Sequence, residues 1–344
     1  MRILTVIGNK NFNAGPKAPR DIVEILKKEY NAKSINLVQS NNSFKKILYR
    51  IKILNNIIIS KIRKEILVFQ FPIYETSDLL NKIFMFSLKR ANKDKTIILI
   101  HDLEGLRNDD KRLNKQDIER LNMVRYVIAH NRAMKEYLQK EGVTSNIYTL
   151  DLFDYLCDSD KIECGNEDRC DINTLVYAGN LVKVKSPFIY QVEEANMKFS
   201  LNLYGVGLEE QNLSNNKIKY QGKFFPDELP NKLEGKLGLI WDGNFDESDE
   251  TSGMKRYTRY NNPHKLSCYM AAGLPVVVWK KAACSEFVKE NNIGYVVGSI
   301  YEINNIDYTD YEEKKKNVLN IKEKVRSGYY TKRIFEEILS DMKG

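Results

Sequence analysis

The sequence predicts an α/β protein made of two Rossmann-like domains in series. Its 344 residues exceed what one ordinary hydrophobic core accommodates, so two domains are the first expectation. Short apolar runs alternate with helical segments through the first half, and the alternation restarts after a polar stretch at residues 158–171. Repeated strand–helix–strand units imply parallel, doubly wound sheets. Two such domains place a ligand cleft between them, at the carboxyl ends of their strands.

The first half contains the elements of an N-terminal domain spanning residues 1–157. Its expected strands are Ile3–Ile7, Ile35–Val38, Ile66–Phe71, Thr96–Ile100, Arg125–Ala129 and Asn146–Leu150. Its expected helices are Arg20–Tyr30, Phe44–Ile62, Leu79–Ala91 and Arg132–Glu141. The polar stretch that follows is nonperiodic and charged, which is typical of an interdomain linker.

The second half contains the elements of a C-terminal domain spanning residues 172–325. Its expected strands are Leu175–Ala178, Leu201–Tyr204, Ile218–Tyr220, Leu237–Trp241, Val276–Val278 and Tyr295–Val297. Charged helices are expected at Tyr311–Val325 and Tyr329–Met342. The final segment, 326–344, either packs back on the first domain or forms a subunit contact.

Composition narrows the class of protein. A net charge of +8 with both signs interleaved suits anionic substrates or an anionic membrane face, and no nucleic-acid motif accompanies it. The five cysteines match no disulfide framework, so free thiols in a reducing compartment are expected. The sequence shows no signal peptide and no membrane span. We therefore expect a cytoplasmic protein, with the inner face of the membrane as an alternative location.

The stretch from Tyr260 to Trp279 is the most informative part of the chain. It reads YNNPHKLSCYMAAGLPVVVW: a polar cluster, a helix that ends at Gly273, and a strand. Asn262 is expected as the N-cap, with Pro263 in the first turn. Free backbone N–H groups and the helix dipole at such an N-terminus favour an anion. The sequence therefore predicts an anion site here, with diphosphate as the expected ligand.

Four further loops follow expected strands and are candidates to face the same ligand. They are Gly8–Gly15, the Gly-Asn-Lys loop at Tyr177–Lys183, the Gly-rich exit Tyr204–Gly207, and a long acidic-then-basic loop at Asp242–Arg259. Glycines allow close backbone approach, and Lys183 supplies a point charge. Ordinary turns and solvated charges remain the alternative interpretation of each loop.

The chain has only three histidines, and one of them, His101, stands beside Asp102 directly after the expected strand Thr96–Ile100. That pair is a candidate to touch substrate, whereas the alternative is that Asp102 only caps the next helix. His130 is expected to be structural. No spacing indicates a metal site or a nucleophilic triad.

Taken together, the motifs resemble the glucosyltransferase-3-like group of GT-B glycosyltransferases. The motifs that carry the resemblance are, in order, IHDLEGLR, YAGNLVK, NLYGVG, YQGKFFPDELP, GLIWDG and the 260–279 stretch. The group includes enzymes that add glucose to N-acetylglucosamine on bacterial serine-rich adhesins, and galactofuranosyltransferases of surface polysaccharide assembly. The resemblance spans about Arg2 to Glu302. It implies the GT-B fold, a UDP-sugar bound by the C-terminal domain, an acceptor on the N-terminal side, no metal or other cofactor, and a homo-oligomer.

The resemblance also implies roles for individual residues. The diphosphate and ribose would be held by Asn180, Lys183, Arg259, Asn261, Asn262, His264 and Lys265. The uracil would lie near Tyr204, Gly205, Lys223 and Phe224. The N-terminal domain would contribute His101, Asp102 and the loop of Asn13, Gly15 and Lys17.

One departure from the wider GT-B pattern concerns two glutamates that many retaining members carry, with seven residues between them. Tyr260 and Cys268 stand at those positions here, so a retaining mechanism is not implied. An inverting reaction needs a base on the acceptor hydroxyl, for which Asp102 and His101 are the candidates and Glu75 is a weaker one. The predicted function is transfer of a hexose, glucose or galactofuranose, from a UDP-sugar to a saccharide or glycoprotein acceptor. The alternatives are a non-catalytic carbohydrate-binding or chaperone-like subunit and a nucleotide-sugar epimerase.

Overall fold

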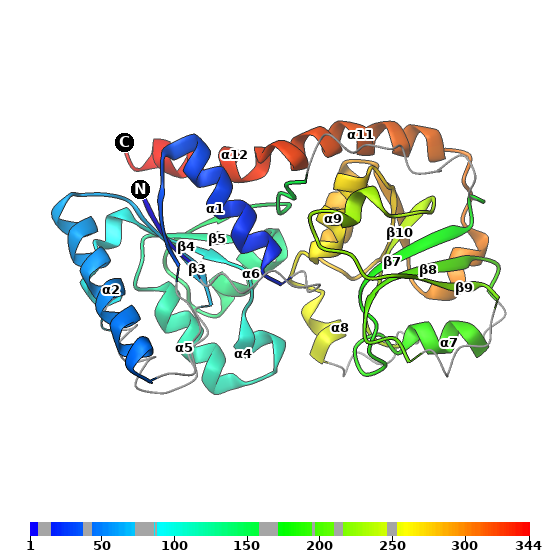
Figure 1. Cartoon of the computed structure of the whole chain (residues 1–344), viewed down its shortest axis with the longest axis horizontal. Coiled ribbons are helices and arrows are strands. Elements are labelled where there is room, and N and C mark those ends of the chain that lie inside the picture. The colour runs from blue at the N-terminus through cyan, green and yellow to red at the C-terminus, as the bar shows by residue number, and fades with distance from the viewer. Residues whose placement is uncertain are drawn as a thin grey trace. The chain divides into compact units, whose positions relative to one another are not determined.

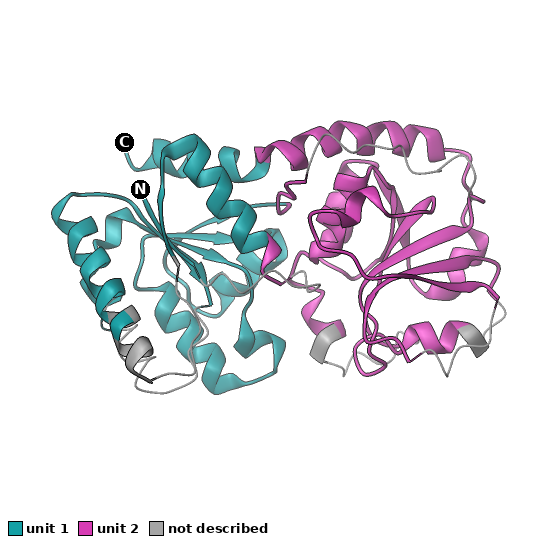
Figure 2. Cartoon of the chain, viewed as in Figure 1, with its two compact units in different colours: residues 1–9, 18–151, 330–344 teal, residues 10–17, 152–329 magenta. Residues whose placement is uncertain are grey.

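The computed structural model describes residues 1–5, 15–36, 43–72, 86, 88–157, 171–194, 197–209, 216–245 and 253–344. The chain divides into two compact units (Figure 2). Unit 1 comprises residues 1–9, 18–151 and 330–344, and unit 2 comprises residues 10–17 and 152–329. The expected helix at 79–91 and the expected linker at 158–171 fall largely outside the described residues. Asn13, Glu75, Cys164 and Cys170 also lie outside them.

Unit 1 is built on a parallel sheet of six described strands, ordered β2-β1-β3-β4-β5-β6 (Figure 1). The strands are β1 (Arg2–Thr5), β2 (Lys33–Asn36), β3 (Leu67–Phe71), β4 (Thr96–Ile100), β5 (Tyr126–Ala129) and β6 (Asn146–Thr149). Its helices are α1 (Lys17–Tyr30), α2 (Ser43–Ile62), α4 (Glu104–Arg107), α5 (Lys111–Leu121), α6 (Arg132–Lys140) and α12 (Tyr329–Asp341), with a 3-10 turn at Lys93–Lys95. Every residue of β3 and β4 is buried, as the apolar runs predict for a sheet covered on both faces.

Unit 2 repeats this architecture with the order β12-β11-β10-β7-β8-β9. The strands are β7 (Thr174–Asn180), β8 (Ser200–Val206), β9 (Ile218–Gly222), β10 (Leu237–Ile240), β11 (Val276–Trp279) and β12 (Gly294–Val297). The helices are α7 (Phe188–Glu194), α8 (Gly253–Tyr257), α9 (His264–Ala272), α10 (Cys284–Glu290) and α11 (Tyr311–Ser327), with 3-10 turns at Leu229–Asn231 and Ile300–Asn305. All described pairings in both sheets are parallel, which confirms the predicted fold class.

The last two helices belong to different units. Helix α11 packs along α9 and ends at Gly328, whose φ of 80° suits a glycine C-cap. Helix α12 joins unit 1 from Tyr330 onward, where the Arg333 guanidinium donates to the carbonyls of Thr149 and Leu150. It also pairs with the Asp151 carboxylate at 2.8 Å.

The helix that follows the polar cluster differs in one detail from the sequence prediction. Helix α9 begins at His264, one residue later than expected, and Pro263 occupies the N-cap position with no side-chain cap. The prediction that Asn262 is the N-cap was therefore wrong. Pro263 has an extended ψ of 133°, so the turn is complete only after it. Gly273 ends the helix with a φ of 82°, as predicted.

No helix in the described part of the chain has both the length and the apolar composition needed to cross a bilayer.

Candidate functional site

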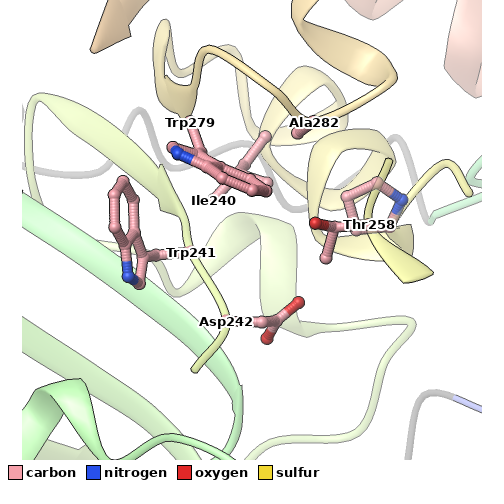
Figure 3. Close-up of a pocket in the computed structure, with 7 residues that line it drawn as sticks. Ile240, Trp241, Asp242, Thr258, Trp279 and Ala282 are labelled. Carbon is pink, nitrogen blue, oxygen red and sulfur yellow. The ribbon is translucent and has the colours of Figure 1, made fainter. Parts of the chain in front are cut away.

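A pocket lies in unit 2 where the central strands of its sheet end. Strand β10 leads into Trp241 and Asp242, and β11 ends in Trp279. These side chains and the residue before α9 surround the hollow (Figure 3). The complete lining is Ile240, Trp241, Asp242, Thr258, Pro263, Trp279 and Ala282. The carboxyl edge of a parallel sheet, next to a helix N-terminus, is where open α/β folds bind ligands.

The two tryptophans form the apolar wall of this pocket. Their rings are 6.4 Å apart in an edge-to-face arrangement. The Trp241 indole N–H donates to the carbonyl of Asn244 at 3.0 Å. The Trp279 indole nitrogen is buried and has no hydrogen-bond partner among the described residues. It is therefore a donor at the edge of the pocket that no described protein atom satisfies.

The cation of the site is Lys265, in the first turn of α9. Its Nζ lies 2.7 Å from Oδ1 of Asp242 and 4.6 Å from the centre of the Tyr177 ring. Both charged side chains are only 16% exposed. Burial disfavours the charged amine, but the nearby Asp242 carboxylate outweighs this and raises the pKa of Lys265 above its ordinary value. Lys265 is therefore a permanent, fixed cation at neutral pH.

Two glycines allow close packing at the strand ends beside that lysine. A Cβ placed on Gly179, near the end of β7, would lie 2.9 Å from Cε of Lys265. A Cβ on Gly205, near the end of β8, would lie 1.8 Å from the Gly179 carbonyl oxygen, and Gly205 also has a φ of 143°. The backbone at Gly179 is thus packed against the lysine side chain, and the backbone at Gly205 is packed against Gly179 in a way that requires glycine.

His264 and Asn261 provide polar atoms without described partners at the start of α9. Both ring nitrogens of His264 and Oδ1 of Asn261 are buried and unsatisfied among the described residues. Burial, and secondarily the positive charge of Lys17, lower the pKa of His264 to about 3, so its ring is neutral near pH 7. A neutral imidazole has one N–H donor and one acceptor nitrogen. Buried polar atoms are almost always satisfied in native proteins, so these atoms indicate a ligand or ordered water.

Lys17 places a second positive charge near His264. The Tyr155 ring stacks on His264 with their centres 5.0 Å apart, and Lys17 Nζ lies 4.7 Å from the centre of the same tyrosine ring. Lys17 also pairs with Asp227 at 3.1 Å and donates to the carbonyl of Leu156. All of these residues belong to unit 2.

Three other residues predicted to bind the donor contact groups other than Lys265 and His264. Asn180 is exposed, and its Oδ1 accepts from the backbone N–H of Val182. Lys183 is exposed, with Nζ 5.6 Å from the centre of the Tyr190 ring. The Arg259 guanidinium carbon lies 5.6 Å from the centre of the Trp279 ring, on the side chain that lines the pocket.

Two of the residues predicted to bind the donor, Asn262 and Tyr204, are buried in the protein. Gly15, predicted to reach the ligand from a loop, is exposed. Tyr204 is fully buried, and its hydroxyl accepts from the backbone N–H of Glu234. Its ring centre lies 6.2 Å from that of Phe224. Tyr204 is thus fixed as a packing residue of β8, whereas the exposed Lys223 follows β9 in the loop.

In unit 1, the predicted pair follows strand β4. The Asp102 carboxylate pairs with Arg107 through one oxygen, while its other oxygen, Oδ1, is buried and has no described partner. The N-cap of α4 is Leu103, so Asp102 does not cap that helix. His101 Nε2 lies 2.6 Å from Oε1 of Gln70. His130 is buried, with Nε2 donating to the Ile100 carbonyl, as its structural interpretation predicts.

Several residues of the site were not singled out individually from the sequence. Trp241, Thr258 and Trp279 line the pocket, while Tyr155 and Tyr177 contact His264 and Lys265. The two tryptophans are the only ones in the chain, and each stands at the end of an apolar run, which is the signal that was available. No group of three or more His, Cys, Asp or Glu side chains that could hold a metal occurs in the described ranges.

Two models of one protein family match most of the chain. Residues 1–152 match the family model described as the N-terminal domain of glucosyltransferase 3-like proteins. Residues 175–338 match the model for the C-terminal domain of the same family.

Two curated relatives support this match. The chain is 32% identical over 351 aligned residues to the beta-1,6-galactofuranosyltransferase WbbI of Escherichia coli (strain K12), covering 100% of this chain and 99% of that protein. It is 25% identical to glucosyltransferase 3 of Streptococcus parasanguinis, covering 79% of this chain and 78% of that protein.

Solved structures share the two-domain GT-B fold. HepE of Anabaena, in complex with UDP-glucose, superposes with a TM-score of 0.60 at 13% identity, covering 100% of this chain and 99% of that one. Sucrose-phosphate synthase of Thermosynechococcus elongatus superposes with a TM-score of 0.62 at 11% identity, covering 99% and 96%. At these identities the likeness concerns the fold.

Proposed function

The chain belongs to the glucosyltransferase 3-like family, and from that premise we propose that it transfers a hexose from a UDP-sugar to a saccharide acceptor. The full-length match to a galactofuranosyltransferase and the partial match to a glucosyltransferase support the enzyme over a non-catalytic subunit. They also make galactofuranose and glucose the two hexoses to test first. The acceptor belongs to glycoprotein or surface glycan synthesis.

One observation carries the donor assignment: the unsatisfied polar atoms of His264 and Asn261 lie beside the N-terminus of α9 and the cation Lys265. Free backbone N–H groups at that N-terminus, a neutral imidazole and a fixed ammonium together suit a diphosphate. Arg259 and the exposed Lys183 and Asn180 extend the same region. In this proposal UDP binds to unit 2, with its diphosphate at α9.

The chemistry requires that charge on the departing UDP be stabilised. Lys265, the α9 N-terminus and Arg259 supply positive potential in a partly desolvated site, where fixed charges act more strongly than in water. We assign these groups the role that a divalent metal has in other transferases, so the reaction needs no added metal.

The acceptor side of the proposal rests on Asp102. Its Oδ1 is buried and has no described partner, while Arg107 holds its other oxygen. A carboxylate oriented in this way is suited to accept the proton of an acceptor hydroxyl in an inverting reaction. His101, held by Gln70, is the second candidate. We further propose a cytoplasmic homo-oligomer, as the family resemblance implies.

Calorimetry with purified protein tests the donor site directly. UDP, UDP-glucose, UDP-galactofuranose, UDP-galactose and UDP-N-acetylglucosamine are titrated in EDTA and again in excess magnesium. We expect UDP and one UDP-hexose to bind equally well in both buffers and to raise Tm. Release of UDP on adding a saccharide acceptor then identifies the transferase. Absence of binding by any of the five would overturn the nucleotide site, and binding without transfer to a panel of acceptors would favour the non-catalytic alternative.

A further inference from the structure

Helix α2 of unit 1, labelled in Figure 1, carries large apolar side chains that remain exposed. Among its described side chains, those of Ile53, Ile57 and Ser60 are buried. The large apolar residues that remain exposed are Leu48 at 50%, Ile51 at 49%, Ile58 at 48% and Ile62 at 75%. Isolated exposed apolar residues are ordinary, but four on one helix form a patch.

The spacing shows that these side chains share one face. Positions 48, 51, 58 and 62 are separated by three, seven and four residues, which places them along one line of an α-helix. Asn55 fills the remaining position of that line and is exposed too. At about 100° per residue, the line lies half a turn from the buried Ile53 and Ile57. Among the described side chains, the helix is thus apolar on two opposite faces, one buried and one exposed.

The charge of α2 is of one sign. Its 20 residues contain no Asp or Glu, whereas the basic residues are Lys45, Lys46, Arg50, Lys52 and Lys61. Arg63 and Lys64 follow immediately. Lys52 and Lys61 are exposed and flank the apolar stripe on its two sides. An apolar stripe between cations is the composition of helices that lie in the interface of an anionic bilayer.

We propose that α2 is a membrane-surface helix that binds unit 1 to anionic phospholipid. The apolar stripe enters the boundary between headgroups and acyl chains, while Lys52 and Lys61 remain among the lipid phosphates. Charge complementarity favours lipid over a second copy of the chain, because two α2 helices packed face to face would bring unbalanced cations together. This surface is independent of the proposed donor site, so the two proposals can fail separately.

Vesicle sedimentation tests the proposal with the intact protein. We expect the protein to sediment with phosphatidylcholine vesicles that contain phosphatidylglycerol, to remain in solution with phosphatidylcholine alone, and to be released by high salt. Equal binding to both vesicles, or no binding to the anionic ones at low salt, would overturn it.

Matched substitutions locate the contact. Leu48→Ser should weaken partitioning about tenfold, whereas Leu319→Ser on α11, where the leucine is 44% exposed, should leave it unchanged. Neutralising Lys52 and Lys61 together (Lys52→Gln, Lys61→Gln) should weaken it about 30-fold, while Lys140→Gln with Lys289→Gln, which removes the same charge elsewhere, should not.

Two further outcomes oppose the proposal. If the α2 and control variants lose partitioning equally, the contact is general charge attraction and not α2. If sedimentation velocity shows a concentration-dependent dimer that Leu48→Ser abolishes, the stripe belongs to a contact between copies of the chain. A cooperative thermal unfolding transition near the wild-type Tm serves as the folding control for every variant, because it does not depend on the proposed donor site.

Discussion

Lys265 Nζ lies 2.7 Å from Asp242 Oδ1, so the main cation of the proposed donor site is paired with a carboxylate of the protein itself. This pair fixes the lysine at the start of α9 and against the Tyr177 ring. It also means that an arriving diphosphate meets both an ammonium and an anion. The first prediction separates the structural role of Lys265 from its role toward phosphate.

Lys265→Met should weaken UDP binding by about 1–3 kcal/mol, because it removes a charged partner of the diphosphate. It should also lower the free energy of unfolding by about 1–3 kcal/mol, since the partly buried Asp242 carboxylate loses its cation. Calorimetry and urea unfolding measure the two effects. In the double variant Asp242→Asn, Lys265→Met, stability should recover while UDP binding stays weak. Recovery of both would assign Lys265 a purely structural role.

Acid destabilisation gives a second prediction, at His130 in unit 1. Burial lowers the pKa of His130 to about 4, so the folded protein holds the ring neutral while the unfolded chain takes up a proton below its ordinary pKa of about 6.5. The resulting stability is present in full above pH 6.5 and is lost as pH falls toward 4. Between pH 7.5 and 5, His130 should therefore account for about 2 kcal/mol of the lost free energy of unfolding.

The variant His130→Asn should remove that part of the pH dependence, whatever its stability at pH 7.5. Urea unfolding of both proteins at the two pH values measures it. His264 contributes in the same direction, because its pKa is also lowered, so the comparison uses the difference between wild type and variant. Parallel pH profiles for the two proteins would contradict the prediction.

The strands were predictable because each is a short apolar run between polar breaks. Thr96–Ile100 was predicted at its observed bounds, and Val276–Val278 needed only one more residue. Helix α5 was not predicted, because its 11 residues, KRLNKQDIERL, contain only three apolar side chains. It is fixed instead by the Asp110 side chain, which caps its N-terminus, and by packing against the neighbouring helix α4.

The site was only partly predictable for a related reason. The 260–279 stretch pointed to the α9 N-terminus, because proline, glycine and polar residues leave a local signature. The Lys265–Asp242 pair and the Tyr155–His264 stack were not predictable, since they join residues 23 and 109 positions apart. Tyr204, which the family resemblance places near the uracil, has a buried ring whose hydroxyl accepts from the backbone N–H of Glu234, and that contact also joins residues far apart in the sequence.

The acceptor side gives a third prediction. Asp102→Asn should lower kcat about 100-fold or more if the carboxylate accepts the acceptor proton, because the amide cannot take it up. UDP affinity should be nearly unchanged, since Asp102 belongs to unit 1. Steady-state turnover and calorimetry on the same preparation measure both. Arg107→Gln is the control for the ion pair alone, and an equal loss in that variant would make Asp102 a positioning residue.

The last prediction compares Gly179, which packs against Lys265, with Gly205, which packs against Gly179. Gly179→Ala places a methyl group 2.9 Å from Cε of Lys265, and a flexible side chain can move away. We expect this variant to fold with nearly normal Tm but to bind UDP about tenfold more weakly, because the ammonium is displaced from its fixed position.

In Gly205→Ala, the added methyl group instead meets the Gly179 carbonyl oxygen at 1.8 Å, at a residue with a φ of 143°, and the backbone cannot move away as a side chain can. That variant should lose several degrees in Tm. Thermal unfolding with and without UDP distinguishes the two, and normal UDP affinity in a folded Gly179→Ala protein would show that the position of Lys265 does not determine binding.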